Sequence, residues 1–190
     1  KKGYIFFAFK GNNTDGNFFI KDAIKNGSEI IITDKFKING WKNNVLFLND
    51  KNPRNLLSKF SSKIFNKKPK NLIGVTGTNG KSSIANFYFQ ILTLNRIKVA
   101  SIGTLGVTGL KVTKNFSNTT FDTIQINKIL KKLKERKIEN VILEASSHGL
   151  NQCRLDGLEF DIGIFTNFTR DHLDYHKTYK NYLNSKLKLF

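Results

Sequence analysis

One short segment, residues 76–83 (TGTNGKSS), restricts the possible folds of this chain more than any other feature. It follows an apolar run at residues 72–75 and precedes an amphipathic stretch at residues 84–94. A strand, a glycine-rich turn and a helix start, in that order, form a loop whose backbone N–H groups can surround a phosphate, and the helix N-terminus adds positive potential. The sequence therefore predicts a nucleoside triphosphate site at this turn.

The residue types in this loop have separate physical roles. Gly77 and Gly80 let the backbone turn closely around a phosphate, Lys81 brings a positive charge, and Ser82 offers a hydroxyl to Mg²⁺. The general pattern has a further glycine where this chain has Val75, so the motif alone leaves an ordinary loop or helix cap as the alternative. The expected ATP-binding set is Gly77, Thr78, Asn79, Gly80, Lys81, Ser82 and Ser83.

The net charge of +18 over 190 residues raises the question of nucleic-acid binding. The lysines are spread along the whole chain together with many Asn, Ile and Phe residues, a mixture typical of an AT-biased coding sequence. The densest basic stretch, residues 128–137, keeps Ile129, Leu130 and Leu133 near helical spacing, which is typical of a solvated helix face. We therefore expect no nucleic-acid partner. A basic nucleic-acid-binding protein, recognisable by steeply salt-dependent binding, is the alternative.

Cysteine content and hydropathy bear on the compartment. Cys153 is the single cysteine, so no disulfide can form within the chain, which suits a reducing cytoplasm. No apolar run reaches the ~20 residues that span a bilayer, and the apolar stretch at residues 4–9 is too short for a signal peptide. We expect a cytoplasmic monomer without membrane insertion.

Apolar periodicity and turn residues predict strands that alternate with helices. The expected strands lie at residues 4–9, 29–33, 45–48, 72–75, 98–102, 140–145 and 163–166. The expected helices lie at residues 18–25, 52–65, 81–94, 122–136 and 178–190, with a loop or short hairpin at residues 103–118. This alternation favours an α/β fold with mostly parallel strands.

The proline-containing segment at residues 66–70 (NKKPK) is the predicted domain boundary. We expect a small N-terminal α/β domain at residues 1–67 and a phosphate-loop ATPase domain with a mostly parallel sheet at residues 68–190. The chain starts at Lys1 without Met and stops at Phe190 within a predicted helix. The expectation is therefore an internal piece of a longer protein, in which the first domain lacks its start and the second its end.

Polar side chains follow two further predicted strands. Glu144 ends the apolar run at residues 141–143 and precedes Ala-Ser-Ser-His-Gly. A dense polar cluster that contains His172, residues 166–174 (TNFTRDHLD), follows the strand at residues 163–166. Because ligands bind at the carboxyl ends of strands in open α/β sheets, we expect Glu144 to provide the second Mg²⁺ contact and the cluster to belong to the site. An ordinary strand end and a structural histidine are the alternatives.

Four segments together resemble the Mur ligases, in order and at sensible spacing over residues 71–190: TGTNGKSS, EASSHGLNQCR, TNFTRDHLDYH and YLNSKLKLF. Within that family, the run SSHGL followed by an arginine is most similar to the MurE group, which adds the third residue of the peptidoglycan stem peptide. Residues 1–65 resemble the family's nucleotide-sugar-binding domain more weakly, mainly through GNNTDG at residues 11–16. Another Mur-type ligase, or one similar to folylpolyglutamate synthetases, is the alternative.

The resemblance implies roles for individual residues. It assigns catalytic roles to Lys81, Glu144, His172 and Lys186, and metal binding to Ser82, Glu144, His172 and Lys186 as N6-carboxylysine. Substrate contacts, along the muramoyl-dipeptide and its uridine nucleotide, fall to Asn12, Asn13, Thr14, Asn118, Thr119, Thr120, Ser146, Gln152 and Arg154. Phe121 and Cys153 stand where relatives often carry other residues, and Cys153 receives no catalytic role.

The carboxylation of Lys186 has a physical basis. A neutral amine reacts with CO₂, and burial near metal ions favours loss of the ammonium charge. The resulting carbamate is an anionic oxygen ligand for Mg²⁺. A solvent-facing helix lysine is the alternative from the residues alone.

The activity implied by the resemblance is ATP-dependent amide ligation in peptidoglycan precursor synthesis. The γ-carboxylate of D-glutamate in UDP-MurNAc-L-Ala-D-Glu attacks the ATP γ-phosphate, and the amine of meso-diaminopimelate or L-lysine then attacks the acyl phosphate. The residues agree with this chemistry, because Lys81, Mg²⁺ and helix N-termini offset the charge of two anions held together. The family's third domain binds the incoming amino acid and is expected to lie beyond this chain, so we expect the fragment alone to be inactive as a ligase.

Overall fold

The computed structural model describes residues 3–11, 14–35, 39–109 and 119–190. The chain forms two compact units, Lys1–Leu57 and Ser58–Phe190, and the division falls within helix α2 (Pro53–Ile64). The boundary predicted at residues 66–70 lies further along the chain and stays a prediction. Within the described ranges, no helix is long and apolar enough to cross a membrane.

The N-terminal unit is a four-stranded mixed sheet with a short helical segment. Its elements before α2 are β1 (Tyr4–Ala8), η1 (Gly16–Phe19), α1 (Ile20–Lys25), β2 (Ser28–Thr33), β3 (Gly40–Lys42) and β4 (Val45–Asn49). The strand order is β1-β2-β4-β3, and only the β3–β4 pair is antiparallel. Ala8, Ile20, Ile31 and Val45 form its buried core.

The central unit is a five-stranded sheet with helices on both faces. Its elements after α2 are β5 (Asn71–Thr76), α3 (Lys81–Leu94), β6 (Val99–Gly103), β7 (Gly106–Thr108), α4 (Thr123–Glu135), β8 (Asn140–Glu144), α5 (Ser147–Asn151), β9 (Ile162–Phe165), α6 (Leu173–His176) and α7 (Tyr179–Leu187). The strand order is β7-β6-β8-β5-β9. All pairs are parallel except the β6–β7 hairpin.

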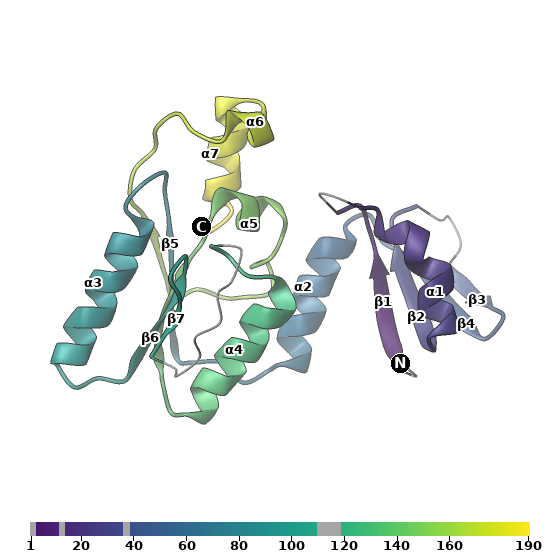
Figure 1. Ribbon diagram of the computed structural model, residues 1–190, viewed down its shortest axis with the longest axis horizontal. Helices are drawn as coiled ribbons and strands as arrows, with labels where there is room; N and C mark the ends of the chain where they lie inside the picture. Colours follow the sequence, from purple (N-terminus) through teal and green to yellow (C-terminus); the bar gives the residue numbers. More distant parts are fainter. Residues whose placement is uncertain (1–2, 12–13, 36–38, 110–118) are drawn as a thin grey trace. The chain divides into compact units, whose positions relative to one another are not determined.

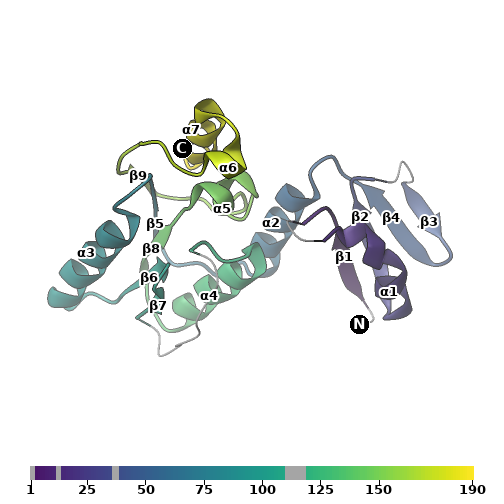
Figure 2. The same ribbon diagram turned by 45° about the horizontal axis from the view of Figure 1, so that its top comes forward.

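Side chains alternate between the two faces of the central sheet, and each face has its own helix. Leu72 and Leu143 belong to the core cluster that includes α4, whereas Ile73 and Ile142 pack in a second cluster with Ala85 of α3. Figures 1 and 2 show α3 on one side of this sheet and α4 on the other, with α5, α6 and α7 gathered near one end of it. Burial on both faces explains why these strands are continuously apolar in the sequence.

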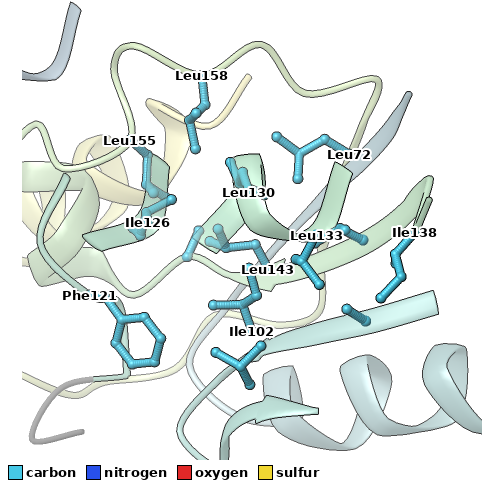
Figure 3. Packing of buried hydrophobic residues seen from close by; sticks show 14 of the residues in the cluster. Leu72, Ile102, Phe121, Ile126, Leu130, Leu133, Ile138, Leu143, Leu155 and Leu158 are labelled. Carbon is cyan, nitrogen blue, oxygen red and sulfur yellow. The ribbon is translucent and has the colours of Figure 1, made fainter. Parts of the chain in front are cut away.

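Helix α4 shows how local sequence and packing agree. Asp122 caps its N-terminus by accepting hydrogen bonds from the backbone N–H groups of the second and third helical residues. Ile126, Leu130 and Leu133 recur on one face of the helix and are completely buried. Figure 3 shows these side chains pointing into the same cluster as Leu143 of β8.

The predicted α/β class with mostly parallel strands is confirmed. The β6–β7 hairpin occupies the start of the predicted loop or hairpin at residues 103–118, of which residues 110–118 lie outside the described part of the chain. The predicted helix at residues 178–190 ends earlier, at Leu187. Strand β3 and helices α5 and α6 were not predicted, because three to five residues are too few to show a hydrophobic period.

Leu130→Ala tests the packing of α4. Leu130 has no exposed surface, so we expect a loss of about 2–5 kcal/mol in the free energy of unfolding, from lost burial and the cavity that is left. Denaturant unfolding followed by circular dichroism measures it. Lys132→Ala, at an exposed position of the same helix, is the matched control and should stay within about 0.5 kcal/mol. Equal losses in the two variants would contradict this packing.

Candidate active site

Three neighbouring strands of the central sheet end beside one another. In the parallel register, Val75 of β5 lies opposite Glu144 of β8, and Thr76 lies opposite Phe165 of β9. The phosphate loop (residues 76–83) follows β5, the Ser-Ser-His-Gly run follows β8, and the polar cluster follows β9. The sheet therefore brings the three predicted motifs to one edge, where α/β sheets bind ligands.

The phosphate loop is fixed against the chain that follows β9. Gly77 has a φ of +143°, and a Cβ there would lie 1.9 Å from Thr166 Oγ1, so this position requires glycine. Thr166 Oγ1 donates a hydrogen bond to Asn79 O at 2.6 Å, and the Asn79 N–H donates to Asn167 Oδ1 at 3.0 Å. Gly80, with a φ of +84°, then turns the chain into α3.

Two lysines converge on one carbonyl of the phosphate loop. Lys81 Nζ donates to Gly77 O at 2.9 Å and to Thr78 O at 2.8 Å. Lys186 Nζ, from α7, donates to the same Gly77 O at 2.6 Å, and Lys186 is only 1% exposed. Lys81 and Lys186, which are far apart in the sequence, are therefore brought to one carbonyl, and their catalytic roles stay predictions.

Burial and mutual repulsion act on these two ammonium groups. Desolvation, followed by the charge of Lys81, lowers the pKa of Lys186 to about 8, although the negative charge of Asp171 acts in the opposite direction. Desolvation also lowers the pKa of Lys81, while Glu144 and Asp171 raise it. The arrangement is cationic and partly dehydrated, which favours an anionic ligand.

The Glu144 carboxylate lies at the end of β8 and is 2% exposed. Ser82 Oγ donates to its Oε2 at 2.9 Å, and Thr104 donates to it through both its backbone N–H and its hydroxyl, each at 3.2 Å. Gly103 allows this approach, since a Cβ there would lie 2.0 Å from Glu144 Oε1. A carboxylate between two hydroxyls is a set of hard oxygen donors, which fits Mg²⁺.

A metal ion beside Glu144 would need further oxygen ligands from outside this group. Among the described residues, no three His, Cys, Asp or Glu side chains are grouped so as to hold a metal. Magnesium commonly keeps several waters and binds through one or two carboxylates plus substrate phosphates. Glu144 and Ser82 therefore fit a nucleotide-bound magnesium better than a site made only of protein side chains.

His172 lies in a cluster that contains all three histidines of the chain. The rings of His148 and His172 are 4.9 Å apart, and those of His148 and His176 are 5.4 Å apart, measured between centroids. His172 Nε2 lies 3.6 Å from Asp171 Oδ2. The His172 ring is also 6.1 Å from the ring of Tyr182 on α7, the helix that carries Lys186. The predicted metal-binding role of His172 stays a prediction.

Four of the predicted substrate residues form one hydrogen-bonded group next to Glu144. Thr120 Oγ1 donates to Glu144 O at 2.9 Å and accepts from the Ser146 N–H at 2.9 Å. The Arg154 guanidinium donates to Thr120 O and, at 2.7 Å, to Gln152 Oε1. Residues that are far apart in the sequence thus line the edge at which β8 ends.

The remaining predicted substrate residues are Thr119, Thr14 and three that the structure does not describe. Thr119 Oγ1 lies 3.1 Å from Thr104 Oγ1, which places it beside the Glu144 group. Thr14 belongs to the N-terminal unit, where its carbonyl accepts from the Gly11 N–H at 2.7 Å. Asn12, Asn13 and Asn118 lie outside the described residues.

Several residues that contact the site were not singled out from the sequence. Thr104 shares the Glu144 carboxylate with Ser82. Asp171, predicted only as a member of the polar cluster at residues 166–174, acts with its charge on both lysines. Tyr182 is completely buried, and its hydroxyl lies 3.1 Å from Thr78 Oγ1 in the phosphate loop. Thr104 directly follows strand β6, and this position after a strand was the one feature of the sequence that could have indicated it as a site residue.

Residues 75–190 match the sequence profile of the Mur ligase middle domain. The chain belongs to the Mur ligase family. The match contains the whole of the edge described above, from the phosphate loop to α7. The resemblance recognised in the sequence is therefore confirmed.

The similarity to Mur ligases extends through both units. The chain is 46% identical over 190 residues to the UDP-N-acetylmuramoyl-L-alanyl-D-glutamate--2,6-diaminopimelate ligase of Rickettsia montanensis, covering 98% of this chain and 39% of that protein. It is 41% identical over 194 residues to the ligase of the same name from Clostridium tetani, covering 100% of this chain and 40% of the relative. The chain thus spans about two fifths of the length of these relatives.

Solved structures agree with this assignment. A UDP-N-acetylmuramoyl-L-alanyl-D-glutamate--2,6-diaminopimelate ligase superposes with a TM-score of 0.82 and 28% identity, covering 100% of this chain and 38% of the other. MurF from Thermotoga maritima in complex with ADP shares the fold, with a TM-score of 0.56 and 19% identity over 100% of this chain and 40% of that one. The fold class predicted from the sequence is that of the Mur ligases.

Thr78→Val tests how the phosphate loop is attached to α7. Thr78 Oγ1 accepts from the Thr169 N–H at 3.0 Å and lies 3.1 Å from the Tyr182 hydroxyl. Valine keeps the shape but leaves both partners without this acceptor, so we expect a loss of about 1–3 kcal/mol in the free energy of unfolding. Thr78→Ser, which keeps the hydroxyl, is the control for chemical denaturation and should lose less than the valine variant.

Proposed function

We propose that this chain forms the nucleotide-binding part of an ATP-dependent amide ligase of peptidoglycan precursor synthesis. Its substrates would be UDP-MurNAc-L-Ala-D-Glu and a diamino acid, and the names of its relatives favour diaminopimelate over L-lysine. One observation carries the proposal: the buried Lys186, the half-buried Lys81 and a magnesium-type carboxylate meet at a phosphate loop, with the Thr120, Ser146 and Arg154 group beside them. This arrangement supports a reaction between two anions.

ATP and Mg²⁺ are the proposed cofactors. The loop from Gly77 to Ser83 would hold the phosphates, with backbone N–H groups and the N-terminus of α3 directed at them. Relatives of the same fold, MurF of Thermotoga maritima and FolC of E. coli, were solved with ADP. Ser82, Glu144 and His172 would hold magnesium, together with Lys186 once carboxylated. When bound, the metal would withdraw negative charge from the phosphate oxygens.

The proposed reaction has two steps. A carboxylate oxygen of the D-glutamate side chain attacks the γ-phosphorus of ATP, the bond to ADP breaks, and an acyl phosphate forms. The neutral amine of the diamino acid then attacks the acyl carbon, phosphate leaves, and the amine loses a proton. Lys81 would stabilise the charge on the transferred phosphoryl group, and the loop would fix the two anions in line.

The carbamate on Lys186 is part of the proposal. Burial, together with the charge of Lys81, lowers the pKa of this lysine to about 8, so a larger fraction of it is the neutral amine that reacts with CO₂. Carboxylation would replace a second ammonium beside Lys81 with an anion and remove their repulsion. It would also provide oxygen ligands for magnesium.

The remaining residues would bind the rest of the substrate. Thr119, Thr120, Ser146, Gln152 and Arg154 would contact the muramoyl dipeptide. Asn118 would contact the same dipeptide. In the N-terminal unit, Asn12, Asn13 and Thr14 would lie along the uridine nucleotide. We also propose a cytoplasmic monomer that acts in cell-wall growth and cell division, with no nucleic-acid partner.

Lys81→Ala tests the role of the loop lysine in the full-length protein. Without its charge, acyl-phosphate formation should fall by at least about a hundredfold, as when a donor to a developing charge is removed. Phosphate release from Mg-ATP measures this, with UDP-MurNAc-L-Ala-D-Glu, diaminopimelate and L-lysine each omitted in turn. Lys67→Ala, an exposed position, is the control. Release that does not depend on the dipeptide nucleotide would instead favour another phosphate-loop ligase.

Lys186→Ala tests the carbamate. We expect activity to be lost and then partly restored by added short carboxylic acids, because these can supply the missing anionic oxygens. The restored rate should saturate with acid concentration, and Lys81→Ala should not respond. No restoration, together with an unmodified Lys186 in the wild-type protein, would count against carboxylation.

A further inference from the structure

His176 is a buried histidine to which the proposed chemistry gives no role. It is the last residue of α6 and is 5% exposed. Its Nε2 lies 3.0 Å from Ser147 Oγ, at the start of α5, and its Nδ1 lies 3.3 Å from Ser185 Oγ on α7. One imidazole therefore bridges two helices that are separate in the sequence.

The hydrogen-bond partners fix which nitrogen carries the proton. Ser185 Oγ donates its hydrogen to Asn181 O at 2.8 Å, so it can only accept from His176. Nδ1 then carries the hydrogen, and Nε2 accepts from the Ser147 hydroxyl. Burial, followed by the charges of His148, His172 and Lys186, lowers the pKa of His176 to about 4, which agrees with a neutral ring that has one donor and one acceptor.

On the α7 side, the bridge ends next to Lys186. Tyr182, Ser185 and Lys186 are the buried residues of this helix. Lys186 Nζ donates to Gly77 O, and the Tyr182 hydroxyl lies 3.1 Å from Thr78 Oγ1, so the same helix contacts the phosphate loop twice. Displacing α7 would therefore displace Lys186 from the loop.

On the α5 side, the bridge ends next to the proposed substrate residues. Ser147 directly follows Ser146, which caps α5 by accepting from the Gly149 N–H at 3.1 Å. The helix leads into Gln152, whose side-chain amide donates a hydrogen bond to the Tyr175 hydroxyl at 3.2 Å. Tyr175 directly precedes His176 in the chain. The imidazole is thus hydrogen-bonded to α5, the helix that lies between the proposed substrate residues Ser146 and Gln152.

We infer that His176 is a positioning residue: its neutral imidazole holds α7, and with it Lys186, in fixed register with α5 and the phosphate loop. What Lys186 does there rests on the proposed function, whereas the bridge itself does not. Catalytic geometry is sensitive to such support, because a displacement of about 1 Å can cost on the order of a hundredfold in rate.

Three substitutions in the full-length protein separate the two ends of the bridge. His176→Phe keeps a ring and removes both hydrogen bonds. His176→Asn places an amide N–H near the position of Nδ1 and can donate to Ser185, whereas His176→Gln places an amide oxygen near Nε2 and can accept from Ser147. Ser185→Ala removes the α7 partner with little change in volume. Asn184→Ala, at the neighbouring exposed position of α7, is the matched control.

Kinetics and chemical labelling are measured for each variant, and the melting temperature is measured as a control for folding. Steady-state kinetics gives kcat and the KM for ATP. Mass spectrometry gives the rate at which Lys186 is acetylated by acetic anhydride in buffer free of CO₂, which does not depend on ligase activity. Lys68, whose ammonium donates to Ser62 Oγ and Gly157 O, is the internal reference for the labelling.

The bridge predicts a specific pattern. His176→Phe and Ser185→Ala should lower kcat, the former on the order of a hundredfold, with little change in the KM for ATP. In both variants, acetic anhydride should acetylate Lys186 faster than in the wild-type protein, while the acetylation rate of Lys68 stays unchanged. His176→Asn should restore most of the wild-type kcat and most of the slow labelling of Lys186. His176→Gln should restore less of both, because only Asn can again donate a hydrogen bond to Ser185 on α7. Should wild-type protein lack ligase activity, the proposed function fails, and the labelling still decides on the bridge.

Two results would overturn the inference. One is His176→Phe with wild-type kcat and wild-type Lys186 labelling. The other is a loss of kcat that is equal in the Phe, Asn and Gln variants and is explained by a lower melting temperature in each. A residue that only fills space would give that result.

Discussion

The parallel register of β5 with its two neighbours is the constraint on which the site depends. Because parallel strands end at the same edge, pairing Val75 with Glu144 and Thr76 with Phe165 brings the phosphate loop, the Glu144 carboxylate and the polar cluster after β9 together. The register is held by the two apolar cores on opposite faces of the sheet. A slip by one residue would exchange these faces and separate the motifs.

Local electrostatics gives this edge its chemical character more than the overall charge does. The net charge of +18 is spread along the chain, whereas Lys81 and Lys186 donate to the same carbonyl and repel each other in a partly dehydrated place. Glu144 and Asp171 act against the lowering of the Lys81 pKa, yet burial keeps that pKa below its usual value. An anion bound at the loop would offset the repulsion between the two lysines, which is why the geometry favours a phosphate ligand.

The helices after β8 and β9 are short, and polar contacts hold them. Helices α5 and α6 contain five and four residues, too few for stability of their own. They are joined to α7 by the Ser147–His176–Ser185 bridge and by the contacts among the histidine and tyrosine rings. Such a cluster can set the position of Lys186 accurately, because its directional hydrogen bonds specify one arrangement.

The sequence by itself determined the α/β class, the longer elements and the location of the phosphate loop, since hydrophobic period and glycine spacing are local properties. It also singled out Glu144 and, through the family resemblance, Lys186. It could not identify Thr104, Tyr182 or His176, whose contacts join segments far apart in the chain. Only the tertiary structure decided that Lys186 is buried against Gly77, because a lysine in a lysine-rich helix has the same local signal whether it faces solvent or a site.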